Sequence, residues 1–331
     1  MDLVNNLDNK FKIVVIGGGT GISNILRGLK KVTNDIVAIV TVADDGGGSG
    51  ALRNELGILP PGDIRNCLIS LANTEPIMKD LLRYRFNEGN LKNQNFGNLF
   101  IAAMIGITSD FEEAIKKTSE VLAITGKVLP VTTENVTLRA ELFNGNIVEG
   151  ESKIPNEVIK NKTGIKNISI IPSDVKPLRD CVNEILNADI ILLGPGSLYT
   201  SILPNLKIEE VVKAINMSKG LRVYISNIMT QPGETDGYTL SDHVNSIFSN
   251  TDISSLDYVI ANDKLLEKHI LKKYESKNSN QVICDYDEIS KLDLILIKDD
   301  LVKLKDDFIR HDHNKLACII RDIMNSRFCS R

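Results

Sequence analysis

Residues 12–42 read KIVVIGGGTGISNILRGLKKVTNDIVAIVTV, two apolar runs separated by a glycine turn and an amphipathic segment. The run KIVVI at 12–16 is rich in β-branched residues, as expected of a strand buried on both faces of a parallel sheet. Apolar residues recur at helical spacing after the glycines, and IVAIVTV at 36–42 repeats the strand pattern. A strand, a glycine turn, a helix and a second strand within about thirty residues predict a βαβ unit.

The rest of the chain extends this pattern. Helical periodicity dominates 63–124, and further strands are expected at 189–193, 221–227 and 257–263. The segment ISII at 168–171 is expected to resume the parallel sheet after a hairpin at 138–152, which turns at Asn144-Gly145. We therefore predict one α/β domain over 1–331. Its sheet is mostly parallel and doubly wound, with helices on both faces and a small β-hairpin insertion at about 137–152.

The composition limits the classes of partner. With 331 residues, 42% hydrophobic content and a net charge of -4, the chain lacks the basic field that nucleic acid binding needs. The five cysteines are scattered and include no C-x-x-C pair, which favours a reducing compartment. The N-terminal stretch has no long apolar core, and no apolar run is long enough to cross a bilayer. We expect a cytoplasmic protein with no nucleic acid partner and no membrane insertion.

In a doubly wound sheet, ligands bind beyond the carboxyl ends of the strands. The turn GGGTG follows the first strand directly, so its backbone N–H groups, at the start of a helix, are candidates for an anion site. The turn departs from the dinucleotide pattern G-x-G-x-x-G because Ile22 stands at the sixth position. After the second strand comes TVADDGGGSG at 41–50, whose acids and glycines suggest another wall of the same crevice. The candidate residues from these two loops are Gly17, Gly18, Gly19, Thr20, Gly21, Asp44, Asp45, Gly46 and Gly47. The alternative is a pair of tight turns with no ligand.

Two later loops also follow predicted strands. LGPGSLYTSILPNL at 193–206 is a second glycine turn, whose hydroxyl groups could cap a helix or bind a phosphate or sugar. SNIMTQPGETDGYTLSDHV at 226–244 is a polar loop at a strand end, where substrates often bind, although it could be a solvated turn. These loops contribute Gly194, Pro195, Gly196, Ser197, Tyr199, Thr200, Asn227, Met229, Thr230 and Gln231 as candidates, with Ser201, Glu234, Thr235 and Asp236 beside them.

Charged and titratable residues outside the glycine turns give further candidates. In PPGDIRN at 60–66, Asp63 is well placed as a helix N-cap, whereas Arg65 lies in the first turn against the helix dipole. Arg65 is therefore expected to bind an anion or to pair with Asp44 or Asp45. His243 is expected to be a hydrogen-bonding residue, although it could act as an acid or base. The pair His311 and His313 is a weak metal signal because no further ligand is near in sequence.

Taken in order, six motifs resemble one family. GGGTG, DDGGGSG, PPGDIRN, GKVLPVT (126–132), GPGSLYTSILPNL and MTQPGETDGY (229–238) are similar to the YvcK group of bacterial gluconeogenesis factors. This group belongs to the superfamily of CofD, the 2-phospho-L-lactate transferase. The resemblance departs from the family pattern at Gly48, where a serine is expected, so any side-chain role at that position is in doubt. It implies a Rossmann-like fold that binds a nucleotide sugar, most notably UDP-N-acetylglucosamine, with Asn98 added to the candidate ligand-binding residues.

The resemblance implies that the protein has a regulatory function. Such a protein would link gluconeogenic carbon flow to cell-wall precursor synthesis and cell shape, acting through an unidentified cell-wall or metabolic regulatory protein, with little or no turnover. A second hypothesis is an Mg²⁺-dependent, CofD-like transfer of a phosphorus-containing group from a nucleotide diphosphate donor. In that case Asp44 and Asp45 would hold the metal, and Asp44, Asp45 and Asp63 are the catalytic candidates. A third hypothesis, a nicotinamide-dependent oxidoreductase, rests on the βαβ unit alone. The oligomeric state is left open, with a homo-oligomer among the options.

Overall fold

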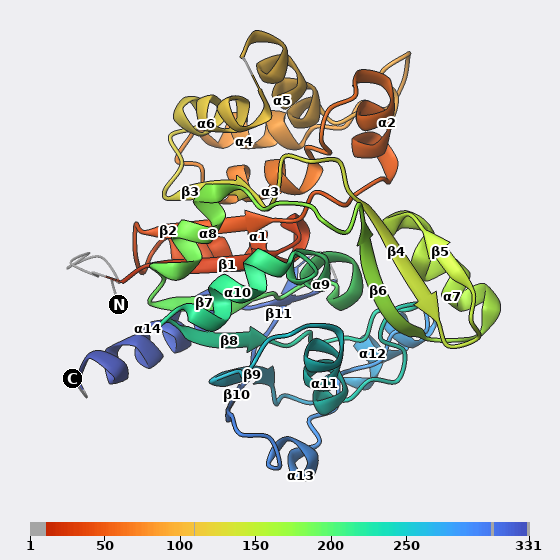
Figure 1. The fold of residues 1–331 in the computed structure, drawn as a ribbon, viewed down its shortest axis with the longest axis vertical. Coiled ribbons are helices and arrows are strands. Elements are labelled where there is room, and N and C mark those ends of the chain that lie inside the picture. The colour runs from red at the N-terminus through yellow and green to blue at the C-terminus, as the bar shows by residue number, and fades with distance from the viewer. Residues whose placement is uncertain (1–10, 109, 306–307, 330–331) are drawn as a thin grey trace.

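The computed structural model describes residues 11–108, 110–305 and 308–329. Its centre is a seven-stranded sheet in the order β10-β9-β8-β7-β1-β2-β3 (Figure 1). Every neighbouring pair in this sheet runs parallel, as predicted. The strands are β1 (Ile13–Gly17), β2 (Ile36–Val40), β3 (Lys127–Pro130), β7 (Ile190–Leu193), β8 (Leu221–Ile225), β9 (Tyr258–Asn262) and β10 (Ile295–Asp299).

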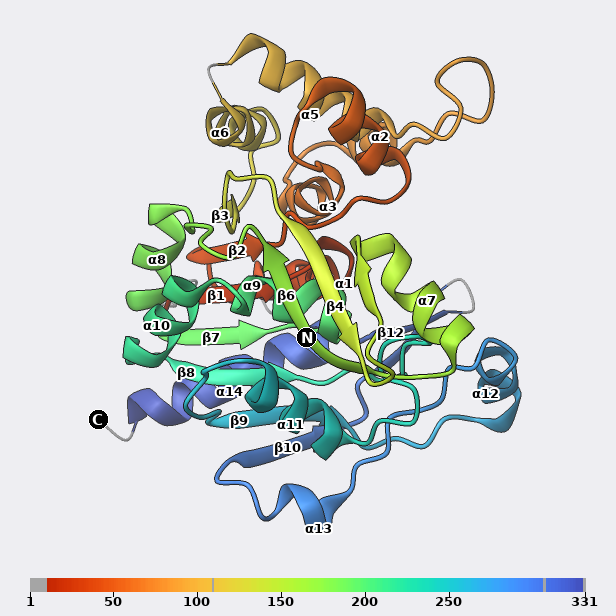
Figure 2. The same ribbon diagram turned by 45° about the vertical axis from the view of Figure 1, so that its right-hand side comes forward.

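The order of the strands creates a switch point at the middle of the sheet. The chain runs outward from β1 through β2 to β3, then returns to place β7 beside β1 and runs outward again to β10. Because crossovers between parallel strands are right-handed, reversing the direction of winding puts helices on opposite faces. On one face α1 (Gly19–Leu29) packs against α3 (Gly62–Leu71) and α14 (His313–Cys329). On the other, α8 (Arg179–Leu186) packs against α10 (Glu209–Met217) (Figures 1 and 2).

The remaining helices extend the two ends of the sheet. Between β2 and β3 the chain builds a helical layer at the top of Figure 1: α2 (Gly47–Leu56), α3, α4 (Pro76–Arg83), α5 (Phe96–Ile107) and α6 (Phe111–Val121). A π-helical turn (η2, Leu198–Ile202) and α9 (Leu203–Leu206) follow β7. Near β8 to β10 lie α11 (Leu240–Asn250), α12 (Lys268–Glu275) and α13 (Tyr286–Ile289). No helix in the described ranges is long and apolar enough to cross a membrane.

A second, antiparallel sheet lies beside the carboxyl ends of the central strands (Figure 2). Its order is β5-β4-β6, from β4 (Thr137–Leu142), β5 (Ile147–Glu149) and β6 (Ile165–Ile171), with η1 (Glu151–Lys153) and α7 (Ile154–Asn161) between β5 and β6. The hairpin prediction is confirmed. The prediction that 168–171 resumes the parallel sheet is wrong, because β6 pairs antiparallel with β4. Only alternate residues of β6 are buried, whereas a central parallel strand is buried on both faces.

Two short strands complete the fold. β11 (Val302–Lys305) and β12 (Phe308–His311) form an antiparallel hairpin just before α14. The Asn24 side chain on α1 donates to the carbonyl oxygen of His311 at 2.6 Å, and the His311 ring bonds the carbonyl oxygen of Ser226 at 2.9 Å. These contacts hold β12 against the carboxyl end of the central sheet.

Candidate functional site

The glycine turns after β1 and β7 touch each other. A Cβ atom added at Gly21 would lie 2.1 Å from the carbonyl oxygen of Pro195, and one at Gly18 would lie 2.5 Å from the Ser201 hydroxyl oxygen. The two turns therefore approach more closely than any side chain would allow. Since β1 and β7 are neighbours at the switch point, this contact confirms the prediction that both turns share one edge of the sheet.

A cavity of about 410 Å³ opens where the turns meet, a volume in the range of small-molecule sites. Its walls come from the two turns, the loop after β8, and β12 with the nearby α12. Nine of the predicted ligand-binding residues line it: Thr20, Gly21, Pro195, Gly196, Ser197, Asn227, Met229, Thr230 and Gln231. The sequence thus identified half of the lining residues, but whether a ligand binds there stays a prediction.

The polar side chains of this wall are already oriented by one another. The Ser197 hydroxyl donates to Gln231 Oε1 at 2.5 Å, and the Gly196 N–H donates to Asn227 Oδ1 at 3.2 Å. The Thr230 side chain is held in place because its Oγ1 accepts the Asn280 N–H at 2.9 Å. The cavity therefore presents a preformed polar surface.

Several helix N-terminal amides expected to face a phosphate instead bind carboxyl groups of the chain. Glu234, only 3% exposed, accepts the N–H groups of Tyr199 at 3.2 Å and Thr200 at 3.3 Å. At the start of α1, the Asp63 carboxyl accepts the N–H groups of Gly19 and Thr20. Burial is the largest cause that raises the pKa of Glu234 to about 7 and that of Asp63 to about 6, while these hydrogen bonds lower both values. The amides of Gly19, Thr20, Tyr199 and Thr200 are thus already satisfied.

The side chains of Tyr199 and Thr200 do not reach the cavity, which corrects the expectation that they contact a sugar. The Tyr199 hydroxyl bonds that of Tyr238 at 2.8 Å, and Thr200 Oγ1 donates to Glu234 Oε1 at 3.0 Å. Both residues are 3% exposed or less. Both residues lie in the π-helical turn η2, most of whose residues are buried.

The glycine-rich stretch after β2 also lies outside the cavity lining. Gly46 is the N-cap of α2 and Gly47 its first residue, so these glycines begin a helix rather than form an open loop. Asp44 Oδ1 accepts the Gly46 N–H, and Asp45 Oδ1 accepts the Ser152 N–H, each at 2.9 Å. The second contact brings the antiparallel sheet's η1 turn to this edge.

The contact between Ser152 and Asp45 also brings Glu151, the residue before Ser152, close to Asp44 and Asp45. Burial, followed by repulsion from Asp44, Glu234, Asp45 and Asp63, raises the pKa of Glu151 to about 8. Five carboxyl groups therefore interact at one edge, and their mutual repulsion favours the protonated form of Glu151. Among the residues the structure describes, no three His, Cys, Asp or Glu side chains are arranged to hold a metal ion.

Arg65 does not form the predicted ion pair with Asp44 or Asp45. Its guanidinium donates to Asn98 Oδ1 at 2.6 Å and to Asn66 Oδ1 at 2.9 Å. Burial is the largest cause lowering its pKa to about 10, which still leaves it charged at neutral pH. Neither Arg65 nor Asn98 lines the cavity, so a ligand contact of either residue stays a prediction.

The histidines behave as hydrogen-bonding residues. His243 is fully buried, with Nδ1 bonded to the Thr239 carbonyl oxygen at 2.8 Å, and burial lowers its pKa. Burial lowers the pKa of His311 to about 4, so its ring is neutral at physiological pH.

Sequence reasoning missed the far wall of the cavity. Asn24, Tyr274, Ser279 and Arg310 all line it, from α1, α12, the segment after α12, and β12. From the sequence, the stretch containing Arg310 and His311 suggests only a weak metal site. No local pattern marks these residues as ligand-binding, since segments far apart in the chain bring them together, and Arg310 lines the cavity through the position of β12 at the end of the sheet.

Comparisons with known proteins identify the family to which this sequence is similar. The family described as 2-phospho-L-lactate transferase CofD matches residues 13–302. The gluconeogenesis factor of Bacillus subtilis is 45% identical over 319 residues, which cover 96% of this chain and 99% of that protein. The gluconeogenesis factor of Halalkalibacterium halodurans is 44% identical over 93% of this chain and 95% of that protein.

A solved structure shows the same fold. The crystal structure of a upf0052 family member from Bacillus halodurans has a TM-score of 0.90 and 44% identity, covering 94% of this chain and 99% of that one. At this identity and coverage, the similarity extends over the central sheet, the glycine turns and the antiparallel sheet together. The chain belongs to the CofD family, on the branch of the gluconeogenesis factors.

Proposed function

We propose that this protein binds a nucleotide sugar, UDP-N-acetylglucosamine, in the 410 Å³ cavity at the switch point. As a regulator it would link gluconeogenic carbon flow to cell-wall precursor synthesis and cell shape. The observation that carries the proposal is the contact between the glycine turns after β1 and β7, which leaves a polar cavity where doubly wound sheets bind nucleotides. The names of the relatives support the regulatory part.

The polar groups of the cavity suit a diphosphate and a sugar. Arg310 supplies the positive charge that a diphosphate requires, and Thr20 and Ser197 supply hydroxyl groups beside it. Asn227 and Gln231 offer amide groups to sugar or base atoms. Because Asp63 and Glu234 occupy amides of both helix N-termini, side chains carry more of this binding than the glycine turns alone would suggest.

Titration calorimetry with UDP-N-acetylglucosamine tests the proposal. Binding is expected both with a chelator and with added Mg²⁺, because the groups lining the cavity can hold a diphosphate without a metal. The variant Arg310→Gln should weaken affinity about tenfold, the equivalent of one charge-assisted hydrogen bond. Arg321→Gln on α14, which removes a partly exposed arginine outside the cavity lining, is the matched control. The absence of any heat with millimolar ligand would exclude this function.

The family match also favours a second candidate, transfer of a phosphorus-containing group from a nucleotide diphosphate donor. The carboxyl groups of Asp44, Asp45 and Asp63 are the acids nearest such chemistry. No three His, Cys, Asp or Glu side chains in the described ranges could hold a metal ion by themselves, so a bound Mg²⁺ would need the phosphates of the donor as further ligands. We therefore assign no catalytic step to them.

Product analysis separates the two candidates. Protein incubated with a nucleotide diphosphate donor, an acceptor and Mg²⁺ should release a mononucleotide if it is a transferase, and Asp45→Asn should abolish that release. A regulator would bind the nucleotide sugar and release none.

A further inference from the structure

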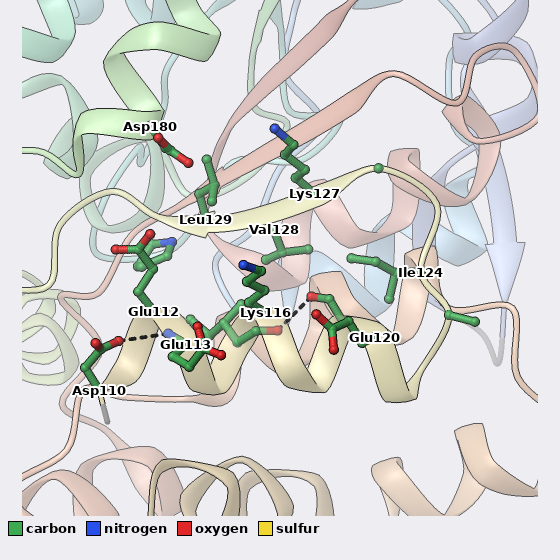
Figure 3. A pocket seen from close by; sticks show the side chains of 15 residues that line it. Asp110, Glu112, Glu113, Lys116, Glu120, Ile124, Lys127, Val128, Leu129 and Asp180 are labelled. Atoms are coloured by element: carbon green, nitrogen blue, oxygen red, sulfur yellow. Dashed lines mark hydrogen bonds between the residues drawn. The ribbon is translucent and has the colours of Figure 1, made fainter. Parts of the chain in front are cut away.

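A second cavity lies along the outer edge of the central sheet. It has a volume of about 720 Å³ and runs between α6, the edge strand β3 and the start of α8 (Figure 3). Figure 3 shows Lys127 and Leu129 pointing toward the α8 side and Val128 toward α6. The groove therefore has the open edge of a strand as its floor and a helix on each side.

The edge of β3 offers main-chain groups to a ligand. The Val131 N–H donates to the carbonyl oxygen of Val40, the last residue of β2. The main-chain groups of successive residues point alternately to the two sides of a strand. Consequently the N–H and C=O of Val128 point away from β2, into the groove. Within the described ranges neither group has a hydrogen-bond partner, although Val128 is only 3% exposed. Sheltered main-chain groups of this kind favour a partner that supplies the missing hydrogen bonds.

Pairing along this edge is limited to a short segment. Beyond it, the Cys181 thiol donates to the carbonyl oxygen of Pro130 at 3.2 Å, and the Leu178 N–H donates to that of Val131. The open part therefore spans 126–129, enough for a few residues of an added strand.

The acidic side chains of the groove favour a basic partner. Five acidic residues and two lysines line the groove. Glu113 and Glu120 pair with Lys117, and Lys127 pairs with Glu184 at 2.6 Å, which leaves Glu112 and Asp180 as the acids that face each other here. Glu112 on α6 and Asp180 at the start of α8 interact across the groove, since Asp180, Asp110 and Glu113 all contribute, after burial, to raising the pKa of Glu112. A cation placed between these acids would relieve their repulsion.

An apolar surface continues from the groove over α6. A neighbouring hollow shares Glu113 and Glu120 with it and is lined by Ile107 and Val121, which are 78% and 58% exposed. Exposed aliphatic side chains beside a charged groove favour a protein partner over a small cation.

We propose that this groove binds an extended, basic segment of another protein, which adds a strand to the edge of β3. Its main chain pairs with Val128, and two adjacent basic residues point to opposite faces of the added strand, one toward Glu112 and the other toward Asp180. The site is independent of the nucleotide-sugar cavity.

Fluorescence anisotropy with a labelled peptide tests the proposal. The probe is the octapeptide Thr-Val-Thr-Arg-Arg-Thr-Val-Thr, and its counterpart carries citrulline in place of both arginines. The E112Q/D180N variant should bind the arginine peptide about fivefold more weakly, since two exposed ion pairs are lost. The D287N/E288Q variant, which removes two exposed acids on α13, should bind it as the unchanged protein does.

A second pair of peptides tests strand addition itself. N-methylation of alternate residues blocks hydrogen bonding along one edge of the peptide, and N-methylation of the other set blocks the opposite edge. Only one of these peptides should lose binding, because an added strand uses one edge. Equal binding of both, equal binding to E112Q/D180N and the unchanged protein, or no binding to either would overturn the proposal.

Discussion

At the scale of single residues, buried carboxyl groups dominate the edge of the sheet. Glu234 and Asp63 bind amides at the starts of two helices, and Glu151 is brought beside them by the Ser152–Asp45 contact. Each carries a raised pKa, mainly from burial. Folding therefore takes up protons here, because the unfolded chain ionises these groups at a lower pH.

This arrangement predicts a pH dependence for Glu151→Gln. The folded-state pKa of Glu151 is raised from 4.5 to about 8, so its favourable contribution is complete below pH 4.5 and is lost as the pH rises through 8. Glutamine stays neutral and avoids that loss. Thermal unfolding should show a Tm above that of the unchanged protein by roughly 2 °C or more at pH 8.5, and no difference at pH 4.5. Glu55→Gln, an exposed acid on α2, is the control; an equal shift at both pH values would contradict this account.

At the scale of elements, the contact between the start of α1 and the turn after β7 builds the cavity. Gly21→Ala should disrupt it, because the added Cβ would lie 2.1 Å from the Pro195 carbonyl oxygen. Forced overpacking of this kind costs about 1–3 kcal/mol of unfolding free energy. The matched control is Gly106→Ala in α5, where a Cβ meets nothing within 4 Å and alanine should stabilise the helix by about 0.5–1 kcal/mol. Urea unfolding measures both, and two changes of the same sign would refute the assignment.

At the scale of the whole molecule, Glu184 on α8 connects the middle and the edge of the central sheet. It accepts hydrogen bonds from Lys12, which precedes β1, and from Lys127 of β3. Burial alone would raise the pKa of Glu184, but the two lysines outweigh it and hold the pKa below its usual value.

Glu184→Gln should therefore lower the unfolding free energy by about 2 kcal/mol at pH 7, as expected for hydrogen bonds to a charged group. Because the folded-state pKa is depressed, the contribution is present above pH 4.5 and disappears as the pH falls below it, so the difference should shrink in acid. Urea unfolding at pH 7 and pH 3 measures this. Glu157→Gln, whose carboxylate forms an exposed pair with Lys160, should change the unfolding free energy by less than about 0.5 kcal/mol. An unchanged loss in acid would indicate packing instead.

The sequence by itself determined the parallel sheet, the hairpin at Asn144-Gly145 and the glycine turns that meet at the switch point, since these follow from periodicity and from where only glycine fits. It could not show that β6 leaves the central sheet, that Tyr199 points inward, that Arg310 lines the cavity, or that Glu151 joins the acidic residues at the edge of the sheet. Those outcomes depend on contacts between segments far apart in the chain, such as Asn24 with His311 and Asp45 with Ser152. Local patterns indicate which residues suit a strand or a helix. Which segments then contact one another depends on packing, which only the tertiary structure decides.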